Sequence, residues 1–107
     1  MEYISVSTSL PDKNSAKKMA KTLVEERLTA CANIFRMDSL YWWREKIEEE
    51  EEYELVFKTR RVLYPELEKR IRELHPYEVP SILSYSLEEG LKDYLGWIDK
   101  ETRKYGV

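Results

Sequence analysis

The sequence has 107 residues and a mass of 12.9 kDa, of which 42% are hydrophobic and 36% are charged. This length fits one domain, which we place over residues 1–107, and no apolar run reaches the roughly 18 residues that a membrane-spanning helix needs. The net charge of −3 argues against general binding to nucleic acid, which requires a basic face that neutralises phosphates. We therefore expect a soluble protein that binds neither nucleic acid nor a membrane.

The start of the chain and its cysteine content bear on location. Residues 3–8 alternate between apolar and polar, and no basic segment followed by an apolar one marks a signal peptide. Cys31 is the only cysteine, so an internal disulfide is impossible and a reducing compartment is favoured. Both features predict a cytoplasmic protein.

Residues 3–8 have the alternation of a first strand, and a helix is expected to follow it. Pro11 and Asp12 supply the turn, with Asp12 as a candidate N-cap. Apolar residues then recur at intervals of three and four, which places them on one helix face. They are Ala16, Met19, Ala20, Leu23, Val24 and Leu28.

The middle of the chain predicts a long hairpin. Residues 30–35, 40–43 and 53–59 have high β-propensity, so they form its two arms, with the five glutamates at positions 48–52 near its tip. These arms exceed the usual strand of five or six residues and would project beyond the sheet, unless a bulge at positions 36–39 turns the hairpin aside. The glutamates lack the alternating ligands and central glycine of a calcium loop, and we interpret them as a solvated tip that discourages edge pairing.

Two adjacent tryptophans stand on this hairpin. Trp42 and Trp43, if extended, point to opposite faces of the sheet, so they cannot both enter one core. Exposed aromatic side chains usually mark interfaces. We therefore expect Tyr41, Trp42 and Trp43 to contact another subunit.

The last part of the chain predicts a second helix at residues 62–74, a strand at 81–87 and a terminal helix from Leu91 to Tyr105. Thr102 is expected inside that helix. On the second helix, Glu–Arg pairs at i and i+4 should lie on a solvated face, and they are Glu66 with Arg70 and Glu68 with Arg72.

The resulting order is β-α-β-β-α-β followed by one more helix. This order predicts an α+β fold, a ferredoxin-like βαββαβ sandwich with an extra C-terminal helix and a long hairpin between the second and third strands.

Several spaced segments resemble the CutA divalent-cation-tolerance family. They are ERLTACANI at 26–34, YWWREKIEEEEE at 41–52, FKT at 57–59, LHPYEVP at 74–80 and DYLGWI at 93–98. The resemblance implies a tight homotrimer, similar in architecture to the PII signalling proteins, in which hairpins from three subunits join their sheets. It also implies a link to tolerance of copper and other divalent metal ions, with copper bound by some members, and no firmly attached catalytic reaction.

Copper(II) favours imidazole nitrogen and copper(I) favours sulfur, so His75 and Cys31 are candidate ligands. The predicted topology places them at opposite ends of the sheet, too far apart to share an ion. His75 remains as the strong ligand, to be completed by a carboxylate such as Glu78 or by other subunits of the trimer. By resemblance, a family copper site has a cysteine late in the first strand and a second histidine beside HPY, where this chain has Ser7 and Leu74.

Each candidate has a simpler alternative. His75 precedes a proline at a helix end and is most simply interpreted as a capping group, favoured there by the helix dipole. Cys31 lies in an apolar run, where a small core residue is the simpler interpretation. Tyr77 and Glu78 either line a pocket between subunits or anchor the loop that follows the helix.

The predicted function is therefore that of a trimeric divalent-cation-tolerance protein that binds copper or a related ion and requires no cofactor. The alternative is a PII-like regulatory or interaction module that binds a small molecule or a protein partner at clefts between subunits. An enzyme is not expected, because the sequence has no Gly-rich phosphate loop, no G-x-S-x-G motif and only one imidazole.

Overall fold

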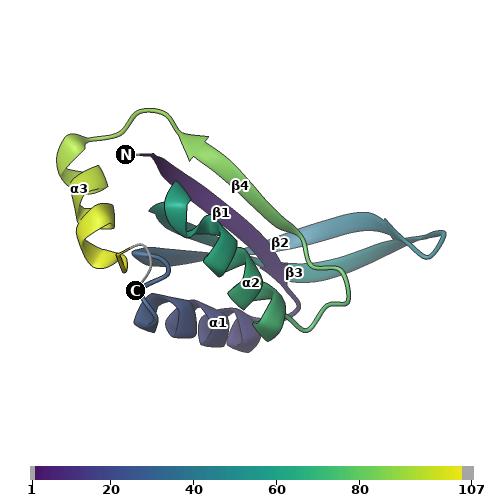
Figure 1. The fold of residues 1–107 in the computed structure, drawn as a ribbon. Helices are drawn as coiled ribbons and strands as arrows, with labels where there is room; N and C mark the ends of the chain where they lie inside the picture. Colours follow the sequence, from purple (N-terminus) through teal and green to yellow (C-terminus); the bar gives the residue numbers. More distant parts are fainter. Residues whose placement is uncertain (1, 105–107) are drawn as a thin grey trace.

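The computed structural model describes residues 2–104 and contains a four-stranded antiparallel sheet in the order β2-β3-β1-β4 (Figure 1). Its strands are β1 (Tyr3–Leu10), β2 (Cys31–Trp43), β3 (Lys46–Arg60) and β4 (Ile82–Leu87). The helices are α1 (Lys13–Glu25), α2 (Tyr64–Leu74), which follows the 3-10 turn η1 (Arg61–Leu63), and α3 (Lys92–Glu101). Helices α1 and α2 cover one face of the sheet, and α3 lies at the end away from the hairpin tip. The predicted α+β order is confirmed.

The core lies between the sheet and the two covering helices. Alternate residues of β1 and β3 point towards it, because strand side chains alternate between faces. Val24 of the predicted helix stripe is 38% exposed, since it lies at the edge of that stripe. The residues buried in this core are Ile4, Val6, Leu10, Ala16, Met19, Ala20, Leu23, Leu28, Leu55, Phe57, Leu67 and Ile71.

Both ends of α1 are capped. The Asp12 carboxylate accepts a hydrogen bond from the Ser15 backbone N–H at 2.8 Å, which confirms the expected N-cap. At the other end Arg27 has φ 60°, and the backbone N–H of Leu28 donates to the carbonyl of Leu23 at 3.2 Å. This is a Schellman motif, so Leu28 lies after the helix rather than in it, yet remains in the core.

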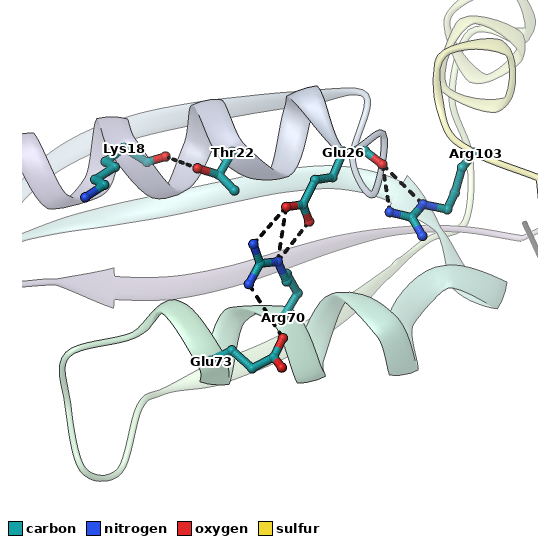
Figure 2. A network of polar contacts seen from close by, with 6 residues as sticks. All are labelled: Lys18, Thr22, Glu26, Arg70, Glu73 and Arg103. Carbon is teal, nitrogen blue, oxygen red and sulfur yellow. Dashed lines mark hydrogen bonds and ion pairs between the residues drawn. The ribbon is translucent and has the colours of Figure 1, made fainter.

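The predicted ion pairs within α2 are wrong. Arg70 instead makes three hydrogen bonds of 2.9 to 3.1 Å to the carboxylate of Glu26 at the end of α1, and lies 3.6 Å from Glu73 (Figure 2). Glu66 pairs with Arg103 at 3.0 Å, and Glu68 accepts from the Tyr64 hydroxyl. A guanidinium that donates to both oxygens of a carboxylate forms a stronger ion pair than two exposed side chains at i and i+4 of one helix. The Arg70–Glu26 pair also joins α1 to α2.

The hairpin of β2 and β3 is longer than expected. The two strands pair without interruption from Cys31↔Lys58 to Trp43↔Lys46, so residues 36–39 form no bulge. The turn is Arg44–Glu45, with φ 49° and 65°, a two-residue turn of type I′. The glutamates at 48–52 therefore lie in β3 and not at the tip, contrary to our expectation.

The outer half of this hairpin leaves the sheet. β1 ends at Leu10, which pairs with Tyr53, so the rest of the hairpin has no neighbouring strand of its own chain. Figure 1 shows it projecting from the body of the molecule, whose principal extents are 44 × 27 × 22 Å. The predicted projection is confirmed.

Helix α3 ends at Glu101, one residue before Thr102, which was expected inside it. The Thr102 hydroxyl donates to the carbonyl of Ile98 and accepts from Nε of the buried Arg60 at 2.9 Å, and its backbone is extended. Tyr105 lies outside the described residues. Within residues 2–104, no helix has the length and apolar character needed to cross a bilayer.

Thr8 gives a test of the core. It is fully buried, and its hydroxyl has no hydrogen-bond partner among residues 2–104. Because Thr8→Val removes a desolvated hydroxyl and keeps the shape, we expect it to raise the free energy of unfolding by about 1 kcal/mol in urea titration. The control is Thr59→Val, since Thr59 is equally buried but donates to the carbonyl of Leu28 at 2.7 Å, and this change should be destabilising. A loss of stability in Thr8→Val would contradict the interpretation that the Thr8 hydroxyl is buried without a hydrogen-bond partner.

Candidate functional site

The candidate site lies where the hairpin leaves the sheet and the chain crosses from α2 to β4. His75 occupies the C-cap position of α2, and its backbone N–H donates to the carbonyl of Ile71 at 2.9 Å. The capping position was predicted. The side chain, however, turns away from the helix and contacts the end of β1.

Both ring nitrogens of His75 have partners. Nε2 lies 2.8 Å from the carbonyl oxygen of Ser9, and Nδ1 accepts from the backbone N–H of Tyr77 at 3.1 Å. Since a carbonyl can only accept, Nε2 carries the proton and the ring is neutral. Burial lowers the pKa of His75, against the opposing effects of the Ser9 carbonyl and of Glu52. The imidazole therefore joins β1 to the loop instead of acting as a charged cap.

Tyr77 continues this set of contacts into β3. Its hydroxyl donates to Oε2 of Glu52 at 2.6 Å, and its ring centroid lies 5.0 Å from that of His75. Burial, followed by the hydrogen bond to Glu52, raises the pKa of Tyr77. Glu52 is only 5% exposed although it lies in a run of glutamates. Tyr77 thus anchors the loop, which was one of its two predicted roles.

A groove of about 990 Å³ lies between this loop and the hairpin. Glu48, Glu50 and Glu52 alternate along β3 and share one face of the hairpin. Tyr41 lies on the same face, and its hydroxyl donates to Glu50 at 3.0 Å. The groove is lined by Ser9, Asp38, Ser39, Leu40, Tyr41, Trp42, Trp43, Glu48, Glu50, Glu52, Pro76, Tyr77, Glu78, Val79 and Ser81.

The side chains near His75 do not complete a metal site with it. Glu78 lines the groove, but its carboxylate lies 3.4 Å from the guanidinium of Arg44, and its side chain is 71% exposed. Ser7 pairs with residues of β3 and β4, and Leu74 packs against the core, so neither adds a ligand to His75. Within residues 2–104, no group of three or more His, Cys, Asp or Glu side chains is placed to hold one metal ion.

Cys31 is not a core residue. It is half-buried, pairs with Lys58, and its sulfur lies 3.8 Å from the hydroxyl of Tyr94. Through Lys58 it is level with Ser5, whereas His75 contacts Ser9, which is about 13 Å further along β1. Cys31 and His75 of one subunit therefore cannot share an ion, as predicted.

The predicted contact residues are exposed to different degrees. Trp42 is 71% and Trp43 38% exposed, while Tyr41 is half-buried at the groove. The guanidinium of Arg44 lies 5.4 Å from the ring centroid of Trp43.

Sequence reasoning missed the burial of Glu52 and the shared face of the three glutamates. The alternation was visible, but only the strand register shows which glutamates face the loop.

Comparison with known proteins places this geometry in a family. Residues 4–101 match the family described as CutA1 divalent ion tolerance protein. A divalent-cation tolerance protein CutA of Pyrococcus horikoshii is 48% identical over 94% of this chain and 99% of its own length, and its crystal structure has a TM-score of 0.92.

Two further solved structures agree. CutA1 from Oryza sativa has a TM-score of 0.94 at 32% identity, covering 97% of this chain and 96% of its own. The Archaeoglobus fulgidus protein, described as periplasmic divalent cation tolerance protein CutA, has a TM-score of 0.91 at 35% identity, covering 92% and 97%.

His75 predicts a pH dependence of stability. Burial lowers its pKa from 6.5, so the unfolded chain takes up a proton at a higher pH than the folded chain. The stability that this shift contributes is complete above about pH 6.5 and is lost as the pH falls through the folded pKa. We therefore expect the free energy of unfolding, measured in urea with EDTA, to fall as the pH is lowered below about 6.5.

His75→Gln is the matched variant. His75 is the only histidine in the chain, so the variant should lose most of this pH dependence. If the free energy of unfolding of His75→Gln changed with pH as much as that of the wild type, the proton uptake would belong to another group.

Proposed function

The chain belongs to the CutA1 divalent ion tolerance family, and we propose that it serves divalent-cation tolerance as a homotrimer that binds copper or a related ion weakly. The role is one of binding and assembly, without catalysis and without a required cofactor. Location in the cytoplasm forms part of the proposal, supported by the unpaired thiol of Cys31. Since the Archaeoglobus relative is described as periplasmic, cell fractionation is the measurement that decides location.

The exposed apolar surface of the hairpin carries the proposal of assembly. Leu40, Trp42 and Ile47 share one face of it, and each is more than 60% exposed. On the other face of the sheet, Phe35, Leu83 and Tyr85 are each more than half exposed. Exposed large apolar side chains on both faces are typical of a protein that buries them against other subunits. The number of three subunits follows from the family resemblance.

Metal binding is proposed to be weak because His75 is already engaged. A metal ion at Nδ1 would displace the hydrogen bond from the Tyr77 backbone, which contributes about 1 kcal/mol. Glu78 would have to leave Arg44, which is easier because both side chains are more than 70% exposed. The neutral imidazole itself has the protonation state that a metal ion needs.

The groove favours a second candidate function. A hollow of about 990 Å³ with aromatic and carboxylate side chains has the size and composition of a small-molecule site. In this case the protein would be a PII-like regulatory or interaction module, with its ligand or partner bound at the clefts between subunits. A metabolite that raises the melting temperature, in a protein whose melting temperature copper does not change, would favour this candidate.

Sedimentation equilibrium tests the trimer. We expect a mass near three times 12.9 kDa under native conditions. Trp42→Ala should weaken assembly about tenfold or more, because large aromatic side chains dominate interface energies. Val24→Ala is the control, since Val24 is also an exposed apolar residue but lies on α1, on the helix layer. A native mass near 12.9 kDa would contradict the proposal.

Copper titration by calorimetry tests the metal site. We expect weak binding by the wild type and at least about a tenfold loss in His75→Ala, because the imidazole is its strongest ligand. Cys31→Ser should bind as the wild type does, since Cys31 is distant from the site. Equal binding by all three proteins would remove His75 as a ligand.

A further inference from the structure

Helix α3 is attached to the domain by little apolar surface. Among residues 92–101 only Ile98 is buried, and it is not part of the core between the sheet and the covering helices. By contrast, α1 and α2 place four and two side chains in that core. Since burial of apolar surface is the main term that holds an element in place, α3 is the helix with the weakest attachment of this kind.

The sequence of α3 adds little helical stability of its own. Leu91 occupies the N-cap position and forms no side-chain hydrogen bond there. Gly96 stands in the middle of the helix, where glycine is less favourable than alanine. This position is exposed, and an added Cβ would meet no atom within 4 Å, so packing gives no reason for a glycine. Residues 88–90, which lead into the helix, are exposed as well.

A buried arginine holds the C-terminal end of α3. The side chain of Arg60, the last residue of β3, is 7% exposed, and its Nε donates to the Thr102 hydroxyl at 2.9 Å. Oδ1 of Asp99 lies 3.6 Å from the same nitrogen, but it is buried and has no hydrogen-bond partner among residues 2–104. An oxygen removed from water without a hydrogen bond raises the free energy of the docked state. Detachment of α3 would return this oxygen to water.

Two further contacts join this end of α3 to the segment that follows α1. Arg27 donates to the Glu101 carboxylate at 2.8 Å, and the Arg103 guanidinium donates to the Glu26 carbonyl at 2.9 and 3.1 Å (Figure 2). The Arg27 side chain is 58% exposed, so solvent weakens its ion pair. Elements with few buried apolar contacts open locally, at a lower free energy than the whole domain.

The only thiol of the chain lies against α3. The sulfur of Cys31 is 3.8 Å from the hydroxyl of Tyr94, and the ring of Tyr94 stacks on that of Trp97 with centroids 5.5 Å apart. Both aromatic residues belong to α3. Movement of the helix away from the domain would therefore uncover the half-buried thiol, and the reactivity of Cys31 reports on that movement.

We propose that α3 opens from the domain as one unit while the sheet, α1 and α2 stay folded, and that its position controls access to Cys31. Residues 88–90 form the hinge. The contact of Arg60 with Thr102 closes the helix onto the end of β3. This inference depends neither on copper binding nor on a ligand in the groove.

Alkylation of Cys31 by iodoacetamide, a neutral reagent, tests the proposal on the full chain. Thr102→Val keeps the side-chain shape but loses the hydrogen bond to a charged group, so it should speed alkylation about tenfold. Gly96→Ala should slow alkylation about fivefold, because alanine favours the helix and fits the open position. Ile71→Val is the control, since it weakens the main core in the last turn of α2 and should leave the rate within about twofold.

Four results would overturn the proposal. Cys31 could react as fast in the native protein as in urea, Gly96→Ala could leave the rate unchanged, or Thr102→Val and Ile71→Val could speed alkylation equally. The rate could also rise when the protein is diluted, which would assign the access to dissociation of subunits. A rate that is independent of protein concentration, slowed by Gly96→Ala and raised by Thr102→Val alone, is the expected result.

Discussion

The uninterrupted pairing of β2 with β3 is the constraint on which the rest of the site depends. Side chains alternate along a strand, so the register from Cys31↔Lys58 to Trp43↔Lys46 decides which residues face the loop. It places Glu48, Glu50 and Glu52 beside Tyr41 and leaves Trp42 with Ile47 on the opposite face. A slip by one residue would exchange the two sets. One register therefore decides which glutamates face the loop and which exposed apolar side chains lie on the other face of the same ribbon.

The turn that sets this register is made without glycine. Arg44 and Glu45 both have positive φ, which costs about 1 kcal/mol each for residues with a side chain. Asn-Gly would form the turn with less strain. Arg44, however, contacts the ring of Trp43 and the carboxylate of Glu78, so its side chain connects the tip of the hairpin to the α2–β4 loop. These contacts offset part of the backbone strain and give a physical reason for an arginine there.

Much of the fold could be predicted from local patterns, and the parts that could not have identifiable causes. Apolar alternation and helical spacing predict the order of the elements, and the two tryptophans predict a surface with unpartnered aromatics. The position of the turn was missed because Arg44–Glu45 carries no turn signal, whereas the glutamate run resembles a loop. The partners of Arg70 were missed because Glu26 lies 44 positions away, at the end of another helix.

Local sequence patterns predict even less of the candidate site than of the fold. A histidine before a proline correctly predicts the end of α2, but only the folded chain brings the Ser9 carbonyl to Nε2 and the Tyr77 N–H to Nδ1. Likewise, the burial of Glu52 follows from the loop that covers it and from no property of the glutamate run itself. Local sequence determines where the chain turns, while tertiary contacts determine which polar atoms remain free to bind.

Tyr77 makes two contacts that a metal ion at His75 would affect together. A metal ion at Nδ1 of His75 needs the Tyr77 backbone N–H to move away, because that N–H occupies the same lone pair. The hydroxyl of Tyr77 donates to Oε2 of Glu52 at 2.6 Å, so a movement of Tyr77 that frees Nδ1 also strains or breaks the contact with β3. The His75–Tyr77–Glu52 connection thus joins the end of α2 to the hairpin, and it opposes metal binding by more than the loss of one hydrogen bond.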